Sequence, residues 1–153
     1  MLKLSSRDDA LYIDLVKRIA QQSRAIRLQV GALLVNDGVM VMGYNGTPRG
    51  WDNCCEHYVP ILDDDGDFLV TNPIPVTKPE VVHAEENCYG KALKNGIKTT
   101  GSTIYLTHSP CMFCSKLIFN SGTIKVMYLD DYRSNDGLKF LEKCGLEIIK
   151  FNK

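Results

Sequence analysis

The sequence lacks any excess of charge and any long apolar run, and each absence excludes a class of protein. Its 153 residues carry 18 basic and 18 acidic side chains, so the formal net charge is zero. A protein that binds a nucleic acid polymer presents a basic face, so we expect no such partner. No apolar stretch approaches the roughly 18 residues of a membrane-spanning helix, so we expect no membrane partner either.

The first residues also lack the apolar core of a secretory signal peptide. The sequence shows no internal repeat and no linker, and its length suits one domain, which we place over residues 1–153. A hydrophobic content of 44% is sufficient for a packed core. Because unpaired cysteines fit a reducing compartment, we expect a cytoplasmic protein.

The spacing of apolar residues predicts an α/β fold. The expected elements are a helix over about 7–23, a hairpin of strands 30–35 and 39–44, a helix that begins near residue 83, and then strands and helices in alternation at 103–107, 112–121, 124–129, 138–144 and 146–150. This alternation predicts that the later strands are parallel. The expected architecture is therefore a three-layer α/β/α sandwich on a mixed five-stranded sheet.

Residues 51–80 form a connection that is long for so small a domain, and such connections are usually functional or contain further structure. Apolar residues at 61–62 and 68–70 flank an acidic run at 63–67, which suggests a small hairpin. The acidic run lacks the spacing of a calcium-binding loop, so a solvated turn is the better interpretation.

Two short motifs, far apart in the sequence, carry the chemistry. They are His-Ala-Glu at 83–85 and Pro-Cys-Met-Phe-Cys at 110–114. Cys111 and Cys114 are three residues apart and so share one face of a helix, and His83 adds a nitrogen. A His-Cys-Cys set leaves one zinc position open, which is typical of a catalytic rather than a structural zinc site.

A Cys-x-x-Cys pair alone has other interpretations. It is also typical of redox proteins and structural zinc sites, and six cysteines can form disulfides. The proline before the first cysteine and the upstream His-x-Glu favour catalysis, because together they complete the signature of the zinc nucleobase deaminases. In that signature the zinc ligands are His83, Cys111 and Cys114.

Two adjacent glutamates compete for the role of proton carrier. Helical spacing places Glu86, three residues after His83, on the His83 face. The H-x-E signature instead selects Glu85, and the first turn of a helix need not follow interior spacing. We therefore predict that Glu85 is the catalytic residue; its structural alternative is a first-turn acid that stabilises the helix dipole.

The sequence resembles the cytidine deaminase superfamily and, within it, the deoxycytidylate (dCMP) deaminases. The similarity covers nearly the whole chain and includes Gln-Val-Gly-Ala at 29–32, Gly-Tyr-Asn-Gly-Thr-Pro-Arg-Gly at 43–50 and both zinc motifs. The zinc motifs are common to the superfamily, whereas the 43–50 loop is the narrower signal for dCMP. The resemblance implies a cytidine deaminase-like fold and zinc-dependent hydrolysis of dCMP to dUMP and ammonia, which supplies dUMP for thymidylate synthesis.

The resemblance also implies how the substrate is held. Asn45 would hold the deoxyribose, and the backbone at Ala84 and Ser109 would contact the base edge. Tyr132 and Arg24 are further candidates for the sugar-phosphate end, although Tyr132 can equally end a strand and Arg24 can be a solvated loop charge.

The 43–50 loop is also a candidate regulatory site. Its three glycines allow backbone N–H groups to face an anion, and its arginine can pair with phosphate. The predicted regulatory residues are Gly43, Tyr44, Asn45, Gly46 and Arg49. The resemblance implies a homo-oligomer, a hexamer, activated by dCTP with Mg²⁺ and inhibited by dTTP; the alternative is a plain turn.

A second metal site stays open at this stage. Some members of the family carry a structural zinc, but Ala25 and Ile26 stand where its first-loop cysteine is expected. Cys54, Cys55 and His57 can bind a metal, yet no complete four-ligand set is visible.

Two other functions compete with dCMP deamination. A redox or structural-zinc protein would keep the cysteines without needing Glu85. A deaminase that acts on another cytosine nucleoside or nucleotide, or on an RNA base, would keep the whole zinc site.

Overall fold

The computed structural model describes residues 6–152, with the backbone alone at 6–7 and 69–72. A central sheet has the strand order β2-β1-β5-β6-β7. Its strands are β1 (Gly31–Asn36), β2 (Val39–Tyr44), β5 (Thr103–His108), β6 (Lys125–Asp130) and β7 (Glu147–Lys150). The helices are α1 (Ser6–Ala20), α2 (Ala84–Lys94), α3 (Met112–Asn120) and α4 (Asp136–Lys143). No helix in this part of the chain is both long and apolar enough to cross a membrane.

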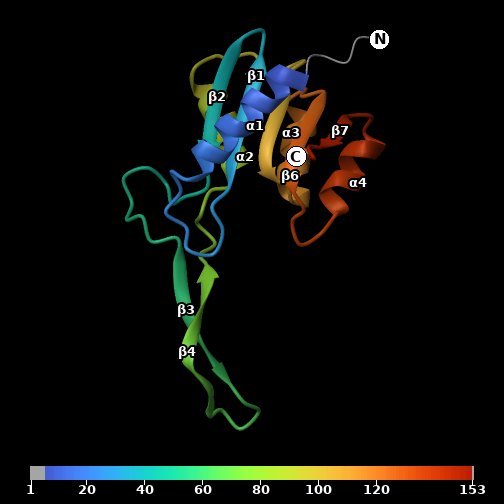
Figure 1. Cartoon of the computed structure of the whole chain (residues 1–153). Coiled ribbons are helices and arrows are strands. Elements are labelled where there is room, and N and C mark those ends of the chain that lie inside the picture. Colours follow the sequence, from blue (N-terminus) through green and yellow to red (C-terminus); the bar gives the residue numbers. More distant parts are fainter. Residues whose placement is uncertain (1–5, 153) are drawn as a thin grey trace.

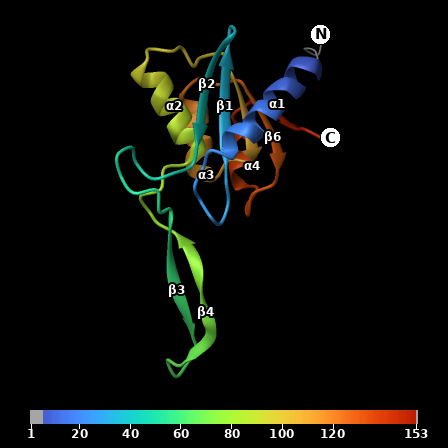
Figure 2. The same cartoon turned by 60° about the vertical axis from the view of Figure 1, so that its left-hand side comes forward.

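The sheet has a helical layer on each side, as Figures 1 and 2 show. One core lies under α1 and is built around Ile13, Val16, Leu33, Tyr105 and Met127. The other lies under α2, α3 and α4, and its fully buried members include Ala32, Ala84, Cys88, Leu106, Ile118 and Leu141. The predicted three-layer α/β/α sandwich is therefore confirmed.

Strand directions also follow the prediction. β1 is antiparallel to both β2 and β5, whereas β5, β6 and β7 are mutually parallel. The β1–β2 hairpin closes through Asp37 and Gly38, which have φ values of 47° and 78°. Two successive residues with positive φ match the right-handed twist of a hairpin, and glycine adopts this conformation without strain.

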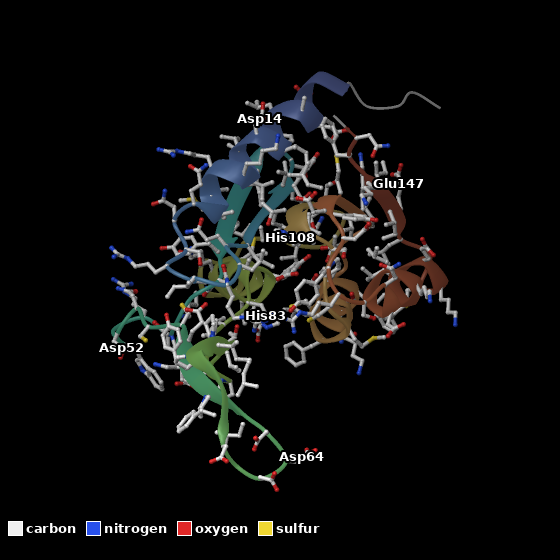
Figure 3. All side chains as sticks on the ribbon, turned by 60° about the horizontal axis from the view of Figure 1, so that its bottom comes forward. Asp14, Asp52, Asp64, His83, His108 and Glu147 are labelled. Atoms are coloured by element: carbon white, nitrogen blue, oxygen red, sulfur yellow. The ribbon has the colours of Figure 1, made fainter. Side chains whose placement is uncertain are left out.

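The long connection holds a second sheet, an antiparallel ribbon of β3 (Glu56–Leu62) and β4 (Phe68–Thr77). The ribbon projects from the body in Figure 1, and Figure 3 shows Asp64 at its far end. The predicted small hairpin is present but much longer than expected. The sequence interpretation missed this length because β4 contains Pro73 and Pro75, and prolines are tolerated only in strands with a free edge, such as those of an isolated ribbon.

Candidate active site

Both zinc motifs lie at helix starts. His83 is the N-cap of α2 and Cys111 is the N-cap of α3, each with extended backbone (φ −70°, ψ 158° and φ −68°, ψ 168°). The backbone N–H of Cys114 donates to the Cys111 sulfur at 3.5 Å. Because the first N–H groups of a helix are unpaired and carry partial positive charge, they stabilise thiolates at this position. All three donors therefore lie at or near the N-terminus of a helix, where the partial positive charge favours the thiolate form of cysteine and the neutral form of histidine.

The three donors converge. His83 Nδ1 lies 3.4 Å from Cys114 Sγ and 3.7 Å from Cys111 Sγ, and all three ligand atoms lie within 4.8 Å of one another. A tetrahedral zinc with nitrogen at about 2.0 Å and sulfur at about 2.3 Å requires N···S distances of roughly 3.5 Å. The observed distances fit that requirement, so the donor set suits zinc.

The three donors of the cluster share protons with one another. The Cys114 thiol donates to Cys111, which lowers the pKa of Cys111 to about 4 and raises that of Cys114 above its usual range. The contact with Cys111 raises the pKa of His83 to about 9. The low pKa favours the Cys111 thiolate, the form in which cysteine binds metal ions, whereas His83 and Cys114 would release their protons when a metal binds.

The two competing glutamates occupy different environments. Glu85 is 5% exposed and lines a cavity beside the cluster, and burial raises its pKa to about 7. Glu86 instead turns back along the helix, where its Oε2 accepts a hydrogen bond from the His83 backbone N–H at 2.8 Å. Glu86 therefore caps α2, and of these two glutamates it is Glu85 that lines the cavity.

The cavity has a volume of about 350 Å³, within the roughly 300–1,000 Å³ range of small-molecule sites. His83, Glu85 and Cys111 line one part of it. Figure 3 shows His83 and His108, which both line this cavity, in the body of the molecule and away from the ribbon tip. Other residues of the lining include Ala25, Arg27, Leu28, Val30, Asn45, Glu56, Thr77, Ala84, His108, Ser109, Asp131, Tyr132 and Arg133.

Four of the five predicted substrate residues lie in this lining, namely Asn45, Ala84, Ser109 and Tyr132. Two of them also hold neighbouring backbone. The Asn45 amide accepts from Val30 N at 2.8 Å and donates to Leu28 O at 2.9 Å. The Ser109 hydroxyl accepts from Tyr132 N at 2.7 Å. The two Asn45 bonds join the segment after β2 to the loop before β1, and the Ser109 bond joins the segments that follow β5 and β6.

Arg24 is one of the two arginines in the loop before β1. It is exposed and is absent from the cavity lining, whereas Arg27, three residues later in the same loop, lines it. The loop bends between them because Ala25 is buried. Residue spacing alone does not show such a bend, so the sequence could not indicate which of the two arginines lines the cavity.

The lining residues that sequence reasoning missed include His108, Arg133 and Glu56. His108 ends β5, and Arg133 follows the end of β6. The carboxyl ends of parallel strands gather ligand-binding residues, so the predicted parallel strands held the signal that would have found both. Glu56 also lines the cavity, but it begins the ribbon and no sequence pattern identified it.

Two glycines of the 43–50 loop have structural roles: one allows close packing, and the other donates a backbone hydrogen bond. A Cβ on Gly43 would lie less than 3.0 Å from the Ala84 carbonyl oxygen, so this glycine permits the close approach of β2 and α2. The Gly46 N–H donates to Val82 O at 3.1 Å and is thus already paired. Tyr44 is half-buried and Arg49 is exposed. The anion-facing role proposed for the glycines therefore has no structural support at Gly43 or Gly46.

No second metal cluster is found among residues 6–152. Cys54 is exposed, whereas Cys55 is buried in a small apolar cluster with Ala25 and Val81. His57 is exposed in β3 and does not join them in a three-donor group. The segment around Cys55 is thus held by apolar packing, at the place where the sequence left a second metal site open.

The fold and the site together define a class of protein. A buried glutamate beside a His-Cys-Cys cluster, built at two helix starts, is the arrangement of zinc-dependent deaminases. The chain belongs to the cytidine and deoxycytidylate deaminase family, because residues 6–130 match the family region described as "Cytidine and deoxycytidylate deaminase zinc-binding region".

Several relatives support this placement. ComE operon protein 2 of Bacillus subtilis is 32% identical over 132 residues, which cover 85% of this chain and 64% of that protein. The deoxycytidylate deaminase of Enterobacteria phage T4 is 29% identical over 88% of this chain and 85% of its own length. The crystal structure of the dCMP deaminase from cyanophage S-TIM5, in complex with dCMP and dUMP, has a TM-score of 0.82 and 35% identity over 97% of this chain and 99% of that one. The chain therefore spans just under two thirds of the Bacillus protein and nearly all of the cyanophage chain.

A glycine outside the signature supports the metal cluster. A Cβ on Gly137, in α4, would lie less than 3.0 Å from both the Pro110 carbonyl oxygen and Ser115 Oγ. We expect Gly137→Ala to push the start of α3 away from His83, to lower the free energy of unfolding by about 1–3 kcal/mol through overpacking, and to weaken zinc retention. Thermal unfolding and zinc content after dialysis measure both effects.

Gly90→Ala is the matched control for Gly137→Ala. Gly90 lies within α2, and a Cβ there meets nothing within 4 Å. It should therefore stabilise the helix by up to about 1 kcal/mol and leave the zinc content unchanged. Equal behaviour of the two variants would contradict the packing role of Gly137.

Proposed function

We propose that this chain is a zinc-dependent deoxycytidylate deaminase, which converts dCMP and water to dUMP and ammonia. The observation that carries the proposal is one cavity lined by His83 and Cys111 of the metal cluster and by the buried Glu85, with two arginines in its walls. The proposal is further supported by the 35% identity to a cyanophage protein whose structure contains dCMP and dUMP.

His83, Cys111 and Cys114 would hold the zinc and leave one position for water. A zinc ion bound there acts as a Lewis acid that lowers the pKa of a water ligand toward 7, so that a nucleophile for C4 of the cytosine ring is available at neutral pH. Glu85 would take one proton from the attacking water and deliver it to ring N3, and would then carry the second proton, from the new hydroxyl on C4, to the amino group, which leaves as ammonia. The net change is the replacement of the exocyclic amine by oxygen.

The remaining walls would orient the nucleotide. Asn45 would hold the deoxyribose, and the backbone at Ala84 and Ser109 would contact the base edge, with Tyr132 beside the sugar. For the phosphate we now propose Arg27 and Arg133 in place of Arg24, because both line the cavity. A guanidinium can form paired, charge-assisted hydrogen bonds with phosphate oxygens.

The expected substrate preference tests the proposed function. We expect kcat/KM for dCMP to exceed that for deoxycytidine by roughly 10²-fold or more, because the nucleoside leaves the arginines in the cavity without their partner. Ammonia release from dCMP, deoxycytidine, CMP and a cytosine-containing RNA measures the preference. Equal values for dCMP and deoxycytidine, or higher turnover of RNA, would contradict it. Zinc content without ammonia release from any substrate would favour a structural-zinc or redox protein.

The wider role extends the same proposal. It comprises a single deaminase domain over 1–153, a cytoplasmic location, a homo-oligomer such as a hexamer, and supply of dUMP for thymidylate synthesis. It also comprises activation by dCTP with Mg²⁺ and inhibition by dTTP at the 43–50 loop, where the exposed Arg49 is the one group that still supports nucleotide binding. These points stay predictions.

A further inference from the structure

We propose that Glu56 is a positioning residue that makes the enzyme selective for a phosphorylated substrate, by holding the segment that carries Arg27. This inference rests on the proposed function and assigns a role to a residue outside both zinc motifs. It concerns the junction between the α1–β1 loop, residues 21–30, and the root of the β3–β4 ribbon.

Glu56 bonds directly to the loop. It is the first residue of β3 and only 3% exposed, and its Oε1 accepts from Ile26 N at 2.9 Å and from Arg27 N at 3.1 Å. A buried carboxylate is costly unless it is hydrogen-bonded, and bonds to a charged acceptor are stronger than neutral ones. The loop therefore cannot shift relative to the ribbon without breaking both bonds and leaving a buried charge unpaired.

The side chain of Arg27 is tied to the same place. Its Nη1 donates to Thr77 Oγ1 at 3.2 Å, and Thr77 is the residue paired with Glu56 across the ribbon. One strand thus holds the Arg27 backbone and the other holds its guanidinium. Arg27, Glu56 and Thr77 all line the cavity. Because a guanidinium has five N–H donors, the bond to Thr77 leaves others for a ligand.

The charge of Glu56 argues for a positioning role. A carboxylate in the wall of a phosphate-binding cavity repels the ligand, so its presence requires a compensating benefit. The lining has two other acidic residues: Glu85 lies beside the metal cluster, and Asp131 forms an ion pair with Lys150. Glu56 has no cationic side-chain partner in the described part of the chain, and its hydrogen bonds go to the loop backbone. The benefit is therefore the fixed position of Arg27.

The test compares Glu56→Ala with Glu56→Gln, using kcat and KM for dCMP and for deoxycytidine. The alanine variant should lose about 10- to 100-fold in kcat/KM for dCMP, mainly through KM, because a misplaced Arg27 no longer meets the phosphate. Its kcat/KM for deoxycytidine should change by less than about threefold, since that substrate has no phosphate to lose. The glutamine variant keeps an acceptor oxygen and should remain selective.

Two further variants control the comparison. Glu80→Ala removes a carboxylate from the segment after the ribbon without touching the loop bonds, and should leave selectivity unchanged. Thr77→Val removes the acceptor for the Arg27 side chain and should lower selectivity in the same direction as Glu56→Ala. Thr77→Val also carries the test if Glu56→Ala does not fold, which thermal unfolding would show.

Several outcomes would overturn the inference. Equal losses for dCMP and deoxycytidine in Glu56→Ala would mean a purely structural role, and unchanged selectivity would mean no role. If the wild type releases ammonia from neither substrate, the proposed function fails separately. Amide hydrogen exchange then decides the positioning role: the N–H groups of Ile26 and Arg27 should be protected in wild type and Glu56→Gln and should exchange faster in Glu56→Ala. Unchanged exchange would refute it.

Discussion

Glu85→Gln is expected to keep its zinc and its fold but to lose about 10²-fold or more in kcat for dCMP, the range for general acid–base groups. Glutamine is close to glutamate in size and fits the same buried position in the cavity wall, but its amide cannot carry a proton between water, ring N3 and the departing amine. Steady-state kinetics, with zinc content measured on the same samples, separates lost proton transfer from lost metal.

Glu86→Gln is the matched control for Glu85→Gln. The two residues are adjacent, but Glu86 accepts from the His83 backbone N–H and caps α2. Glutamine also serves in this capping position, so the variant should keep kcat and lose at most about 1 kcal/mol of stability. Near-normal turnover in Glu85→Gln, together with loss in Glu86→Gln, would reverse the assignment.

The alternation of helices and strands after residue 81 made the main sheet predictable. Each element there carries an apolar pattern and is followed by a glycine or a turn: Gly96 lies just beyond α2, and Gly122 lies just beyond α3. The ribbon was only partly predictable. The side chains of β3 are mostly exposed, without the period-two burial that identifies a strand, and two prolines interrupt β4.

The metal cluster was predictable because its donors follow a short signature with fixed spacing. The cavity wall was not, because it joins residues that are far apart in the sequence. Arg27, Glu56 and Thr77 come from a loop and two strands, and hydrogen bonds between them decide which arginine faces the cavity. No local pattern records such contacts.

The roles of individual glycines could not be predicted from the sequence. Gly43 and Gly46 were interpreted as anion-facing positions, but the structure uses one for the close packing of β2 on α2 and the other in a bridge to Val82. Conversely, Gly137 belongs to none of the predicted motifs, although it permits the close approach of α4 to the start of α3, where Cys111 lies. A glycine shows that backbone lies close to something, and only the fold identifies the neighbour.

Cys111→Ala is expected to lose the zinc that wild type holds at about one ion per chain, and with it all measurable dCMP turnover. Two donors remain after the substitution, below the three that a catalytic zinc site requires. Because a ligand that binds only the folded state stabilises it, wild type should also unfold at a lower temperature once a chelator removes the metal, whereas Cys111→Ala should not respond. Elemental analysis and thermal unfolding with and without chelator measure the two effects.

Cys54→Ala is the control for Cys111→Ala, since Cys54 is an exposed free cysteine outside the cluster. It should keep wild-type zinc content, turnover and chelator response, because the described chain assembles one three-donor group and Cys54 is not in it. Unchanged zinc in Cys111→Ala would refute the ligand set. A wild-type content of two ions per chain, falling to one in Cys54→Ala, would instead support the second metal site at Cys54, Cys55 and His57. The loss of a ligand of that site would release its ion and leave turnover intact.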